Sequence, residues 1–185
     1  MSATETFPLV VITGPVGVGK TTTAWALSAL LTQHAIPHTM IDVDALRATF
    51  PPPSDDRFNE RLGHRNLADV TRNAREVGST RLIAADVIES NAGKDAYREA
   101  IPDAAVIVVR LIASIEAIHA RILTRNSAGA GSEAGVAWER DRAAELIAIM
   151  DAADVADIRI ETSGRGADEV AREIGVWLGW LSEDA

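Results

Sequence analysis

A glycine-rich segment near the N-terminus has the residue types that a polyphosphate requires. It reads Gly14-Pro15-Val16-Gly17-Val18-Gly19-Lys20-Thr21, which is a glycine, four further residues and then Gly-Lys-Thr. Glycines allow backbone N–H groups to converge on a phosphate without steric bulk, and a lysine adds a positive charge that bridges the β- and γ-phosphates. The hydroxyl of Thr21 can ligate Mg²⁺ between the same phosphates. The segment therefore predicts a triphosphate and Mg²⁺ site, the alternative being a glycine-rich turn that only caps a helix.

Acidic residues follow two of the apolar runs that we expect to be strands. Asp42 and Asp44 lie at the end of the second such run, and Asp86 ends the run Leu82-Ile83-Ala84-Ala85. A carboxylate in this position can hold the water shell of a metal ion or accept the proton of an attacking hydroxyl. We expect Asp44 to act as the base, Asp42 to bind the substrate and Asp86 to lie beside the metal, and each of the three remains a candidate for the base.

The same acids have structural alternatives. Asp42 and Asp44 share a face only if the extended conformation continues through Val43. Either residue can instead cap the helix that follows, because aspartates at strand ends are common in turns. Asp86 can be an ordinary loop acid, and Glu89 competes with it for the same role.

Two arginines precede the segment that looks most flexible. Arg121 and Arg125 are four residues apart, so they share one face of a helix. They lead into residues 126–136, which are rich in glycine and small side chains and which we expect to form a flexible lid. A closing lid brings guanidinium groups to a transferring phosphoryl group, which makes Arg125 a candidate catalytic residue and Arg121 a candidate nucleotide contact. The alternative is a solvated helix face with ordinary ion pairs.

A second set of basic residues suggests where an anionic acceptor would bind. Arg47 follows Asp44 by three residues and offers a fork of donors, and Arg65 ends a stripe with Arg57 and Arg61 at four-residue spacing. We expect Arg47 and Arg65 to bind the substrate, the alternative for the stripe being a solvated face balanced by nearby acids. The histidines show no ligand spacing, so no zinc site is expected.

Strands and helices must alternate to bring these residues together. Apolar runs predict strands near residues 7–12, 38–42, 81–86, 104–111 and 157–161. Apolar residues at three- and four-residue spacing predict helices that contain Leu27, Leu67, Ile118 and Val170, and a further helix is expected from about residue 137 to 152. This alternation favours an α/β fold with a parallel sheet covered by helices, in which the loops at the carboxyl ends of the strands form the site. We expect one domain over residues 1–185.

The composition restricts the class of protein. The chain has 185 residues, of which 47% are hydrophobic and 24% are charged, enough for one buried core. Its formal net charge of −9 excludes broad coating of nucleic acid, so no nucleic-acid partner is expected. The absence of cysteine excludes disulfides and thiolate catalysis, and no apolar run is long enough to span a bilayer. We therefore expect a cytoplasmic protein without membrane contact, whose oligomeric state stays open.

Taken together, the motifs resemble the small P-loop kinases of the P-loop NTPase superfamily over nearly the whole chain. The phosphate loop, the segment Asp42-Val43-Asp44-Ala45-Leu46-Arg47, the arginine pair and the segment Glu161-Thr162-Ser163-Gly164 are most similar to those of adenylylsulphate kinases and chloramphenicol phosphotransferases. The resemblance implies the P-loop NTPase fold with a five-stranded parallel sheet. It implies phosphate contacts from Gly14 to Thr22, substrate or base roles for Asp44 and Arg47, and lid charge from Arg121 and Arg125. It also implies adenine contacts near Ser163, Gly164 and Arg165.

The resulting hypothesis is an ATP- and Mg²⁺-dependent phosphotransferase, a kinase that acts on a hydroxyl of an unidentified small molecule. Lys20, Asp44 and Arg125 are its expected catalytic residues. ATP is favoured because no Asn-Lys-x-Asp motif that reads guanine occurs. The acceptor stays open, since Val43 stands where adenylylsulphate kinases have glycine. The alternative is a P-loop ATPase or nucleotide-dependent switch that acts on a protein partner, while the net charge disfavours a kinase for nucleic-acid ends.

Overall fold

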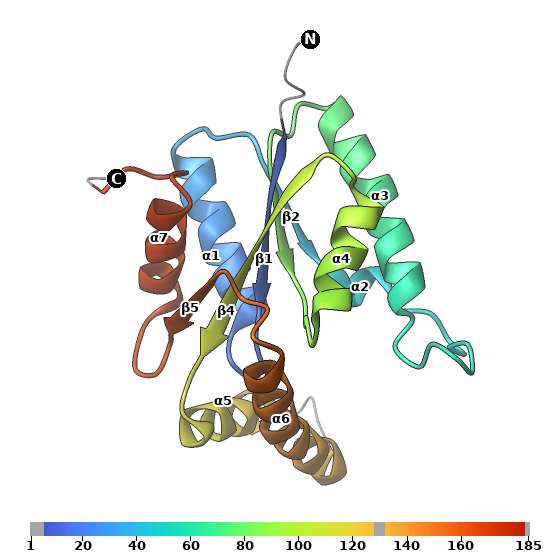
Figure 1. Cartoon of the computed structure of the whole chain (residues 1–185). Helices are drawn as coiled ribbons and strands as arrows, with labels where there is room; N and C mark the ends of the chain where they lie inside the picture. The colour runs from blue at the N-terminus through green and yellow to red at the C-terminus, as the bar shows by residue number, and fades with distance from the viewer. Residues whose placement is uncertain (1–5, 128–131, 184–185) are drawn as a thin grey trace.

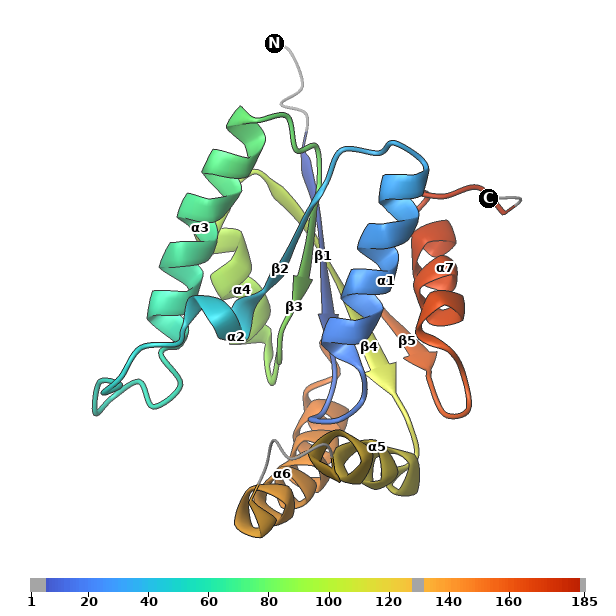
Figure 2. The ribbon, with the colours of Figure 1, turned by 180° about the vertical axis from the view of Figure 1, so that it is seen from behind.

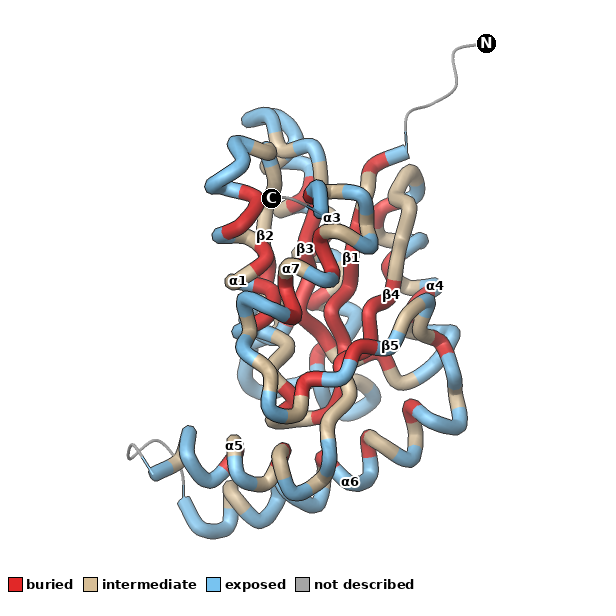
Figure 3. Tube along the Cα trace, turned by 90° about the vertical axis from the view of Figure 1, so that its left-hand side faces the viewer, coloured by how far each residue is buried: buried red, intermediate tan, exposed pale blue. Residues whose placement is uncertain are grey.

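Five parallel strands form one sheet, in the order β2-β3-β1-β4-β5. The structure is a computed structural model that describes residues 6–127 and 132–183. The strands are β1 (Phe7–Thr13), β2 (Thr39–Asp42), β3 (Leu82–Ala85), β4 (Ala104–Ile112) and β5 (Ile158–Glu161). The central strands are buried on both faces (Figure 3), which explains why they are nearly continuous apolar runs in the sequence.

Helices cover both faces of this sheet (Figures 1 and 2). On one face, α1 (Lys20–Gln33) and α7 (Ala167–Trp177) pack against Val10 and Ile12 of β1. On the other, α3 (Glu60–Glu76) and α4 (Asn91–Ala100) pack against Leu9 and Val11. Alternate residues of β1 therefore belong to two separate cores, as the two-residue period of a strand requires.

The carboxyl ends of the strands meet at one edge of the sheet, where three further helices lie. The short helix α2 (Val43–Leu46) follows β2 directly. The helices α5 (Ile115–Ser127) and α6 (Glu133–Ala153) pack together beyond this edge (Figures 1 and 2). Their placement leaves the loop after β1 between the sheet and the α5–α6 pair.

One half-buried ion pair connects distant parts of the second face. Lys94 Nζ of α4 lies 2.7 Å from Asp157 Oδ2, just before β5. The same carboxylate oxygen accepts a hydrogen bond from the backbone N–H of Val108, at 2.7 Å. Lys94 thus fixes α4 against the β4–β5 side of the sheet.

The expected α/β fold and its five-stranded parallel sheet are confirmed, and the differences concern helices. Helix α4 was not predicted, because only Lys94 and Tyr97 of its ten residues are buried and no apolar repeat marks it. Helix α6 begins at Glu133, where the Ser132 side chain accepts a hydrogen bond from the backbone N–H of Gly135. Of the expected lid, residues 126–127 and 133–136 are therefore helical, and residues 128–131 lie outside the described residues.

None of the helices within residues 6–127 and 132–183 is both long and apolar enough to cross a membrane.

Candidate active site

The glycine-rich loop turns sharply between β1 and α1, and two of its glycines leave no room for a side chain. Gly14 has φ +145°, and a Cβ atom there would lie 2.6 Å from the carbonyl oxygen of Leu111 at the end of β4. Gly17 has φ +81°, and its Cβ would lie 2.7 Å from Cγ1 of Ile122 in α5. The loop is therefore held between the sheet edge and α5, in a conformation that favours glycine.

Lys20, the first residue of α1, reaches back over this loop. Its Nζ donates hydrogen bonds to the carbonyl oxygens of Gly14 at 3.0 Å and Pro15 at 3.2 Å. Burial lowers the pKa of Lys20, and the carboxylates of Asp44 and Asp86 partly oppose that effect. The ammonium group thus sits over the concave loop, positioned for the charge of a phosphate chain.

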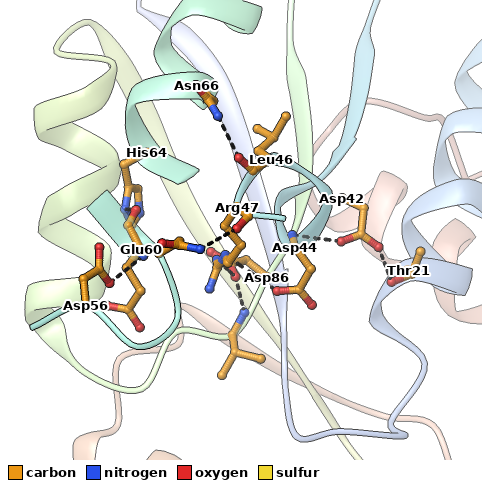
Figure 4. Close-up of polar contacts among 12 residues, drawn as sticks. Thr21, Asp42, Asp44, Leu46, Arg47, Asp56, Glu60, His64, Asn66 and Asp86 are labelled. Carbon is orange, nitrogen blue, oxygen red and sulfur yellow. Dashed lines mark hydrogen bonds and ion pairs between the residues drawn. The ribbon is translucent and has the colours of Figure 1, made fainter. Parts of the chain in front are cut away.

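Asp42 and Asp44 belong to different local structures, because strand β2 ends at Asp42 and α2 begins at Val43 (Figure 4). Asp42 caps α2, since its Oδ1 accepts a hydrogen bond from the backbone N–H of Asp44 at 3.1 Å. The other oxygen, Oδ2, accepts from the hydroxyl of Thr21 at 2.9 Å. The extended conformation does not continue through Val43, so the two carboxylates reach the sheet edge separately: Asp42 beside the phosphate loop and Asp44 from the first turn of α2.

The side chain of Asp44 is 71% exposed, and it lines the main cavity. Partial desolvation at the cavity wall raises the pKa of Asp44, against the opposing charge of Arg47, whose Nε lies 3.7 Å from Asp44 Oδ1. Asp44 is thus a carboxylate with one weak ion-pair contact and access to the cavity. That combination suits proton transfer.

Asp86 is held in a buried network of donors (Figure 4). Its Oδ1 accepts from Arg47 at 2.5 Å and from the backbone N–H of Val87 at 2.8 Å, and its Oδ2 accepts from the Tyr97 hydroxyl at 2.7 Å. The residue is 3% exposed. Burial, and then the Asp86 charge, raise the pKa of Tyr97 well above its ordinary value, so the phenol stays a donor. Both carboxylate oxygens of Asp86 are therefore engaged by protein groups.

Helix α3 supports this network through one of its faces. Asn59, which precedes the helix, donates from Nδ2 to the carbonyl oxygens of Arg47 and Thr49, at 3.0 and 2.8 Å. About two turns further, Asn66 donates to the carbonyl oxygen of Leu46 at 2.7 Å (Figure 4). These bonds fix the chain after α2, and with it the backbone of Arg47.

A cavity of about 710 Å³ is lined by the phosphate loop and Asp44, whereas Asp42, Arg47 and Asp86 are not among the described residues that line it. The cavity has two sides, because the glycine-rich loop follows β1, which lies in the middle of the sheet with β3 and β2 on one side and β4 and β5 on the other. On one side of the loop, Asp44 and Val87 come from the ends of β2 and β3; on the other, Thr162 and Arg165 follow β5. The α5–α6 pair contributes a further wall of four residues, Arg121, Arg125, Trp138 and Glu139.

The two arginines of α5 have different surroundings. Arg121 donates from Nη1 to the carbonyl oxygen of Val18 at 2.9 Å and from Nη2 to that of Thr162 at 2.5 Å, which joins the loop to the β5 side of the cavity. Arg125 is 54% exposed and pairs with Glu139 of α6, with 2.7 Å between Nη2 and Oε2. Arg121 is thus fixed to the backbone, whereas Arg125 is held by a single carboxylate at the cavity wall.

Comparison with known families decides what kind of site this is. A model of the adenylylsulphate kinase family matches residues 7–123, which cover all the elements from β1 to most of α5. The chain belongs to the adenylylsulphate kinase family. The resemblance seen in the motifs is confirmed, and this family member is an ATP-dependent small-molecule kinase. A search of curated proteins found no match.

Solved structures extend the likeness beyond the matched region. The tunicamycin resistance protein of Deinococcus radiodurans has a TM-score of 0.58 at 24% identity, over 94% of this chain and 96% of that one. A gluconokinase of Sinorhizobium meliloti 1021 has a TM-score of 0.62 at 18% identity, over 97% of both chains. The Mycobacterium tuberculosis APS kinase in complex with AMPPNP and APS has a TM-score of 0.59 at 17% identity, over 95% and 99%. These likenesses show that the P-loop kinase fold extends through β5 and α7.

Some residues predicted for the site of this family member lie elsewhere. Arg65 is exposed on α3 and is not among the described residues that line the cavity, and Arg61 of the same stripe pairs with Asp55 at 3.0 Å. Glu89 pairs with Arg142 of α6 and so holds α6 to the loop after β3. Arg61 thus has the ion pairing of a solvated face, the alternative given for the stripe.

The residues predicted after β5 lie at one side of the cavity of this kinase. Arg165 lines it and pairs with Glu169 and Glu173 of α7, at 2.7 and 2.6 Å. Ser163 accepts a hydrogen bond on Oγ from the backbone N–H of Ser114 at 3.0 Å, and Gly164 turns the chain with φ +71°. The turn is therefore built by local contacts, and Arg165 is its part that faces the cavity.

Tyr97, Trp138 and Glu139 are among the residues of the family member's site that were missed from the sequence. Tyr97, the single tyrosine of the chain, lies in a helix that no periodicity marked. Trp138 and Glu139 fall within the helix that was expected near residues 137–152 but carry no motif. An aromatic residue next to an acid, on a polar helix that follows the arginine pair, was the one available signal.

Proposed function

We propose that this family member transfers the γ-phosphoryl group of ATP to a hydroxyl of a small molecule, with Mg²⁺ as its cofactor. One observation carries the proposal: a single cavity is lined by Lys20 and Thr21 of the phosphate loop and by Asp44, a carboxylate able to accept a proton. A phosphoryl donor and an acceptor hydroxyl bound in this cavity would lie next to one another. Holding both reactants in one place is the main requirement for phosphoryl transfer.

The residues present fit a triphosphate and Mg²⁺. The loop is open to an anion at Lys20, which among the described residues forms no ion pair with a carboxylate. The Thr21 hydroxyl and the Asp42 carboxylate, 2.9 Å apart, are oxygen ligands of the kind that Mg²⁺ prefers. Bound Mg²⁺ would supply charge neutralisation at the phosphates. We therefore propose Thr21 and Asp42 as the metal-side residues, and Asp86, suggested for this role by the sequence, as the residue that positions Arg47.

The proposed transfer assigns each side chain one task. Asp44 accepts the proton of the acceptor hydroxyl while the oxygen of that hydroxyl bonds to the γ-phosphorus. The bond from the γ-phosphorus to the oxygen that bridges it to the β-phosphorus breaks at the same time, which leaves ADP. Lys20 and Arg125 stabilise the charge that develops, Arg125 after it separates from Glu139. Arg47 orients Asp44 and the acceptor. Proposed nucleotide contacts are Thr22, Arg121, Ser163, Gly164 and Arg165.

A transfer screen tests this function. We expect radiolabel from γ-labelled ATP to appear in at least one hydroxyl compound of a metabolite panel, with ADP formed in equal amount. The rate of ADP formation without an acceptor is the control. ATP hydrolysis that no hydroxyl compound stimulates, but that a protein partner does, would replace this proposal by the nucleotide-dependent switch.

Substitution of Asp42 tests the metal assignment. We expect Asp42→Asn to raise the Mg²⁺ concentration for half-maximal rate by about tenfold, because one anionic ligand or water-holding group is lost. High Mg²⁺ should restore part of the rate, as measured by ADP formation in an Mg²⁺ titration. Asp86→Asn is the matched control, expected to lower the melting temperature without that shift. A shift in Asp86→Asn alone would return the metal role to Asp86.

The pH dependence of the rate follows from Asp44. A base must be ionised to accept a proton. Partial desolvation raises the pKa of the Asp44 carboxyl above that of an ordinary aspartate. We therefore expect kcat/KM to fall as the pH drops through this raised pKa. At higher pH Asp44 is fully ionised and the rate should no longer rise on its account. Initial rates across buffers of constant ionic strength measure this limb. An acid limb that is unchanged in the residual activity of Asp44→Asn would exclude Asp44 as its origin.

A further inference from the structure

The side of the cavity formed by the ends of β2 and β3 contains one large aromatic residue. We call this side the acceptor end and define it by Asp44, Val87, Arg125, Trp138 and Glu139. Trp138 lies on α6 and is 50% exposed. A tryptophan left half exposed in a cavity wall offers a broad apolar face to whatever enters.

Helix α6 places Trp138 at this end and not at the β5 side. Arg142 lies four residues after Trp138, on the same helix face, and pairs with Glu89 in the loop that follows β3. The residue after Trp138, Glu139, pairs with Arg125, so this part of α6 lies against the last turns of α5. Trp138 and the half-buried Val87 together form the apolar part of the acceptor end.

The arginines around the acceptor end are already neutralised by acids. Arg125 pairs with Glu139 at 2.7 Å, and Arg47 pairs with Asp86 at 2.5 Å. Arg142 pairs with Glu89 and, at 2.7 Å, with Glu145.

The balance of charge at the acceptor end is therefore unfavourable for an anion. Its wall holds two carboxylates, Asp44 and Glu139, against one guanidinium, Arg125. When Arg125 turns to the transferring phosphoryl group, Glu139 loses its partner and adds further negative potential. A carboxylate or sulfate on the acceptor would lie among these groups, because Lys20, which lines the same cavity and has only carbonyl partners among the described residues, is assigned to the phosphates.

We infer that the acceptor is a hydroxyl compound without negative charge that lays a ring, aromatic or sugar, against Trp138. This inference rests on the proposed function and names the substrate class of the same site. It replaces the anionic acceptor that Arg47 and the arginine stripe of residues 57, 61 and 65 suggested. The hydroxyl proton passes to Asp44, the acceptor oxygen takes the phosphoryl group, and ADP leaves.

A panel of matched acceptors tests the substrate class. It contains uncharged ring alcohols (nucleosides, methyl glycosides and aryl propanediols), their carboxylate- or sulfate-bearing counterparts, and open-chain polyols. We expect kcat/KM for the best uncharged ring compound to exceed that of its anionic counterpart and of every polyol by about tenfold or more. Glu139→Gln should bring kcat/KM for the uncharged compound and for its anionic counterpart closer together, because it removes a negative charge and frees Arg125.

Substitution of Trp138 tests the contact itself. We expect Trp138→Ala to raise the KM for that acceptor by about tenfold with the KM for ATP unchanged, and Trp138→Phe to keep most of the affinity. Trp25→Ala, on α1 and 59% exposed, is the matched control and should change neither constant. Acceptor binding should also quench tryptophan fluorescence in Trp25→Phe but not in Trp138→Phe.

The outcomes separate this inference from the function it rests on. Transfer to an anionic acceptor in preference to its uncharged counterpart, or an unchanged acceptor KM in Trp138→Ala, would overturn the inference and leave the kinase proposal intact. Absence of transfer to every member of the panel, with ATP hydrolysis present, would overturn both.

Discussion

Replacing Lys20 by alanine is expected to reduce phosphoryl transfer by about a thousandfold or more, because the charge above the loop acts on the β- and γ-phosphates as they separate. Binding of ATP should weaken more than binding of AMP, which lacks both groups. The fold should survive, since burial already disfavours the charged form of Lys20 and only two hydrogen bonds within the loop are lost. Steady-state rates, calorimetric titration with each nucleotide and thermal unfolding measure the three effects.

The control for this variant is the other lysine of the chain. Lys94→Met removes the ion pair with Asp157, so it should lower the melting temperature while the folded enzyme keeps its rate and its affinity for ATP. Retention of nucleotide affinity and turnover by folded Lys20→Ala would show that the glycine-rich loop does not hold the triphosphate.

Replacing Asp44 by asparagine is expected to lower transfer to the acceptor by about a hundredfold to ten-thousandfold, because an amide cannot accept the hydroxyl proton. Binding of ATP and the Mg²⁺ requirement should be retained, since Asp42 and Thr21 hold that part of the site. Helix α2 should also persist, because its cap uses the side chain of Asp42 and only the backbone N–H of Asp44. Rapid-quench measurement of the first turnover isolates the chemical step.

The control for Asp44 is an exposed aspartate with a similar local pair. Asp95→Asn breaks an i,i+3 contact with Arg98 on α4, a helix with no residue among those that line the cavity, and should leave the first turnover unchanged. Full activity of Asp44→Asn, or recovery of its rate at high Mg²⁺, would assign the base to another carboxylate.

Much of the fold was predictable because its signals are short in sequence. The loop from Gly14 to Thr21 lies between an apolar run and an amphipathic helix, so all its chemistry falls within eight positions. β4 was predicted almost to the residue, since its burial on both faces demands a β-branched apolar run. α4 escaped prediction because its packing depends on Tyr97 and Lys94, whose partners come from other segments.

The acceptor side was less predictable, because its contacts join distant residues. Asp86 and Arg47 are 39 positions apart in the sequence. Nothing in the sequence near either residue shows that both carboxylate oxygens of Asp86 accept hydrogen bonds from protein donors. The roles of Asp42 and Asp44 depended on whether β2 continued through Val43, which is decided by the capping bond to the backbone of Asp44. Arg65 followed a regular spacing, but α3 contacts the site through Asn59 and Asn66 instead.

The strand order has a consequence for how the chain folds as it is synthesised. β1 is made first, yet its neighbours are β3 and β4, and β2 pairs with β3. No strand can therefore pair with a neighbour before residue 82 has been added. The loop at Gly14 packs against the backbone of Leu111, so it is not confined until that residue has been added as well. The wall at Thr162 comes later still. Nascent chains shorter than this cannot hold the nucleotide in its complete cavity, so ligand-assisted folding acts only on nearly finished chains.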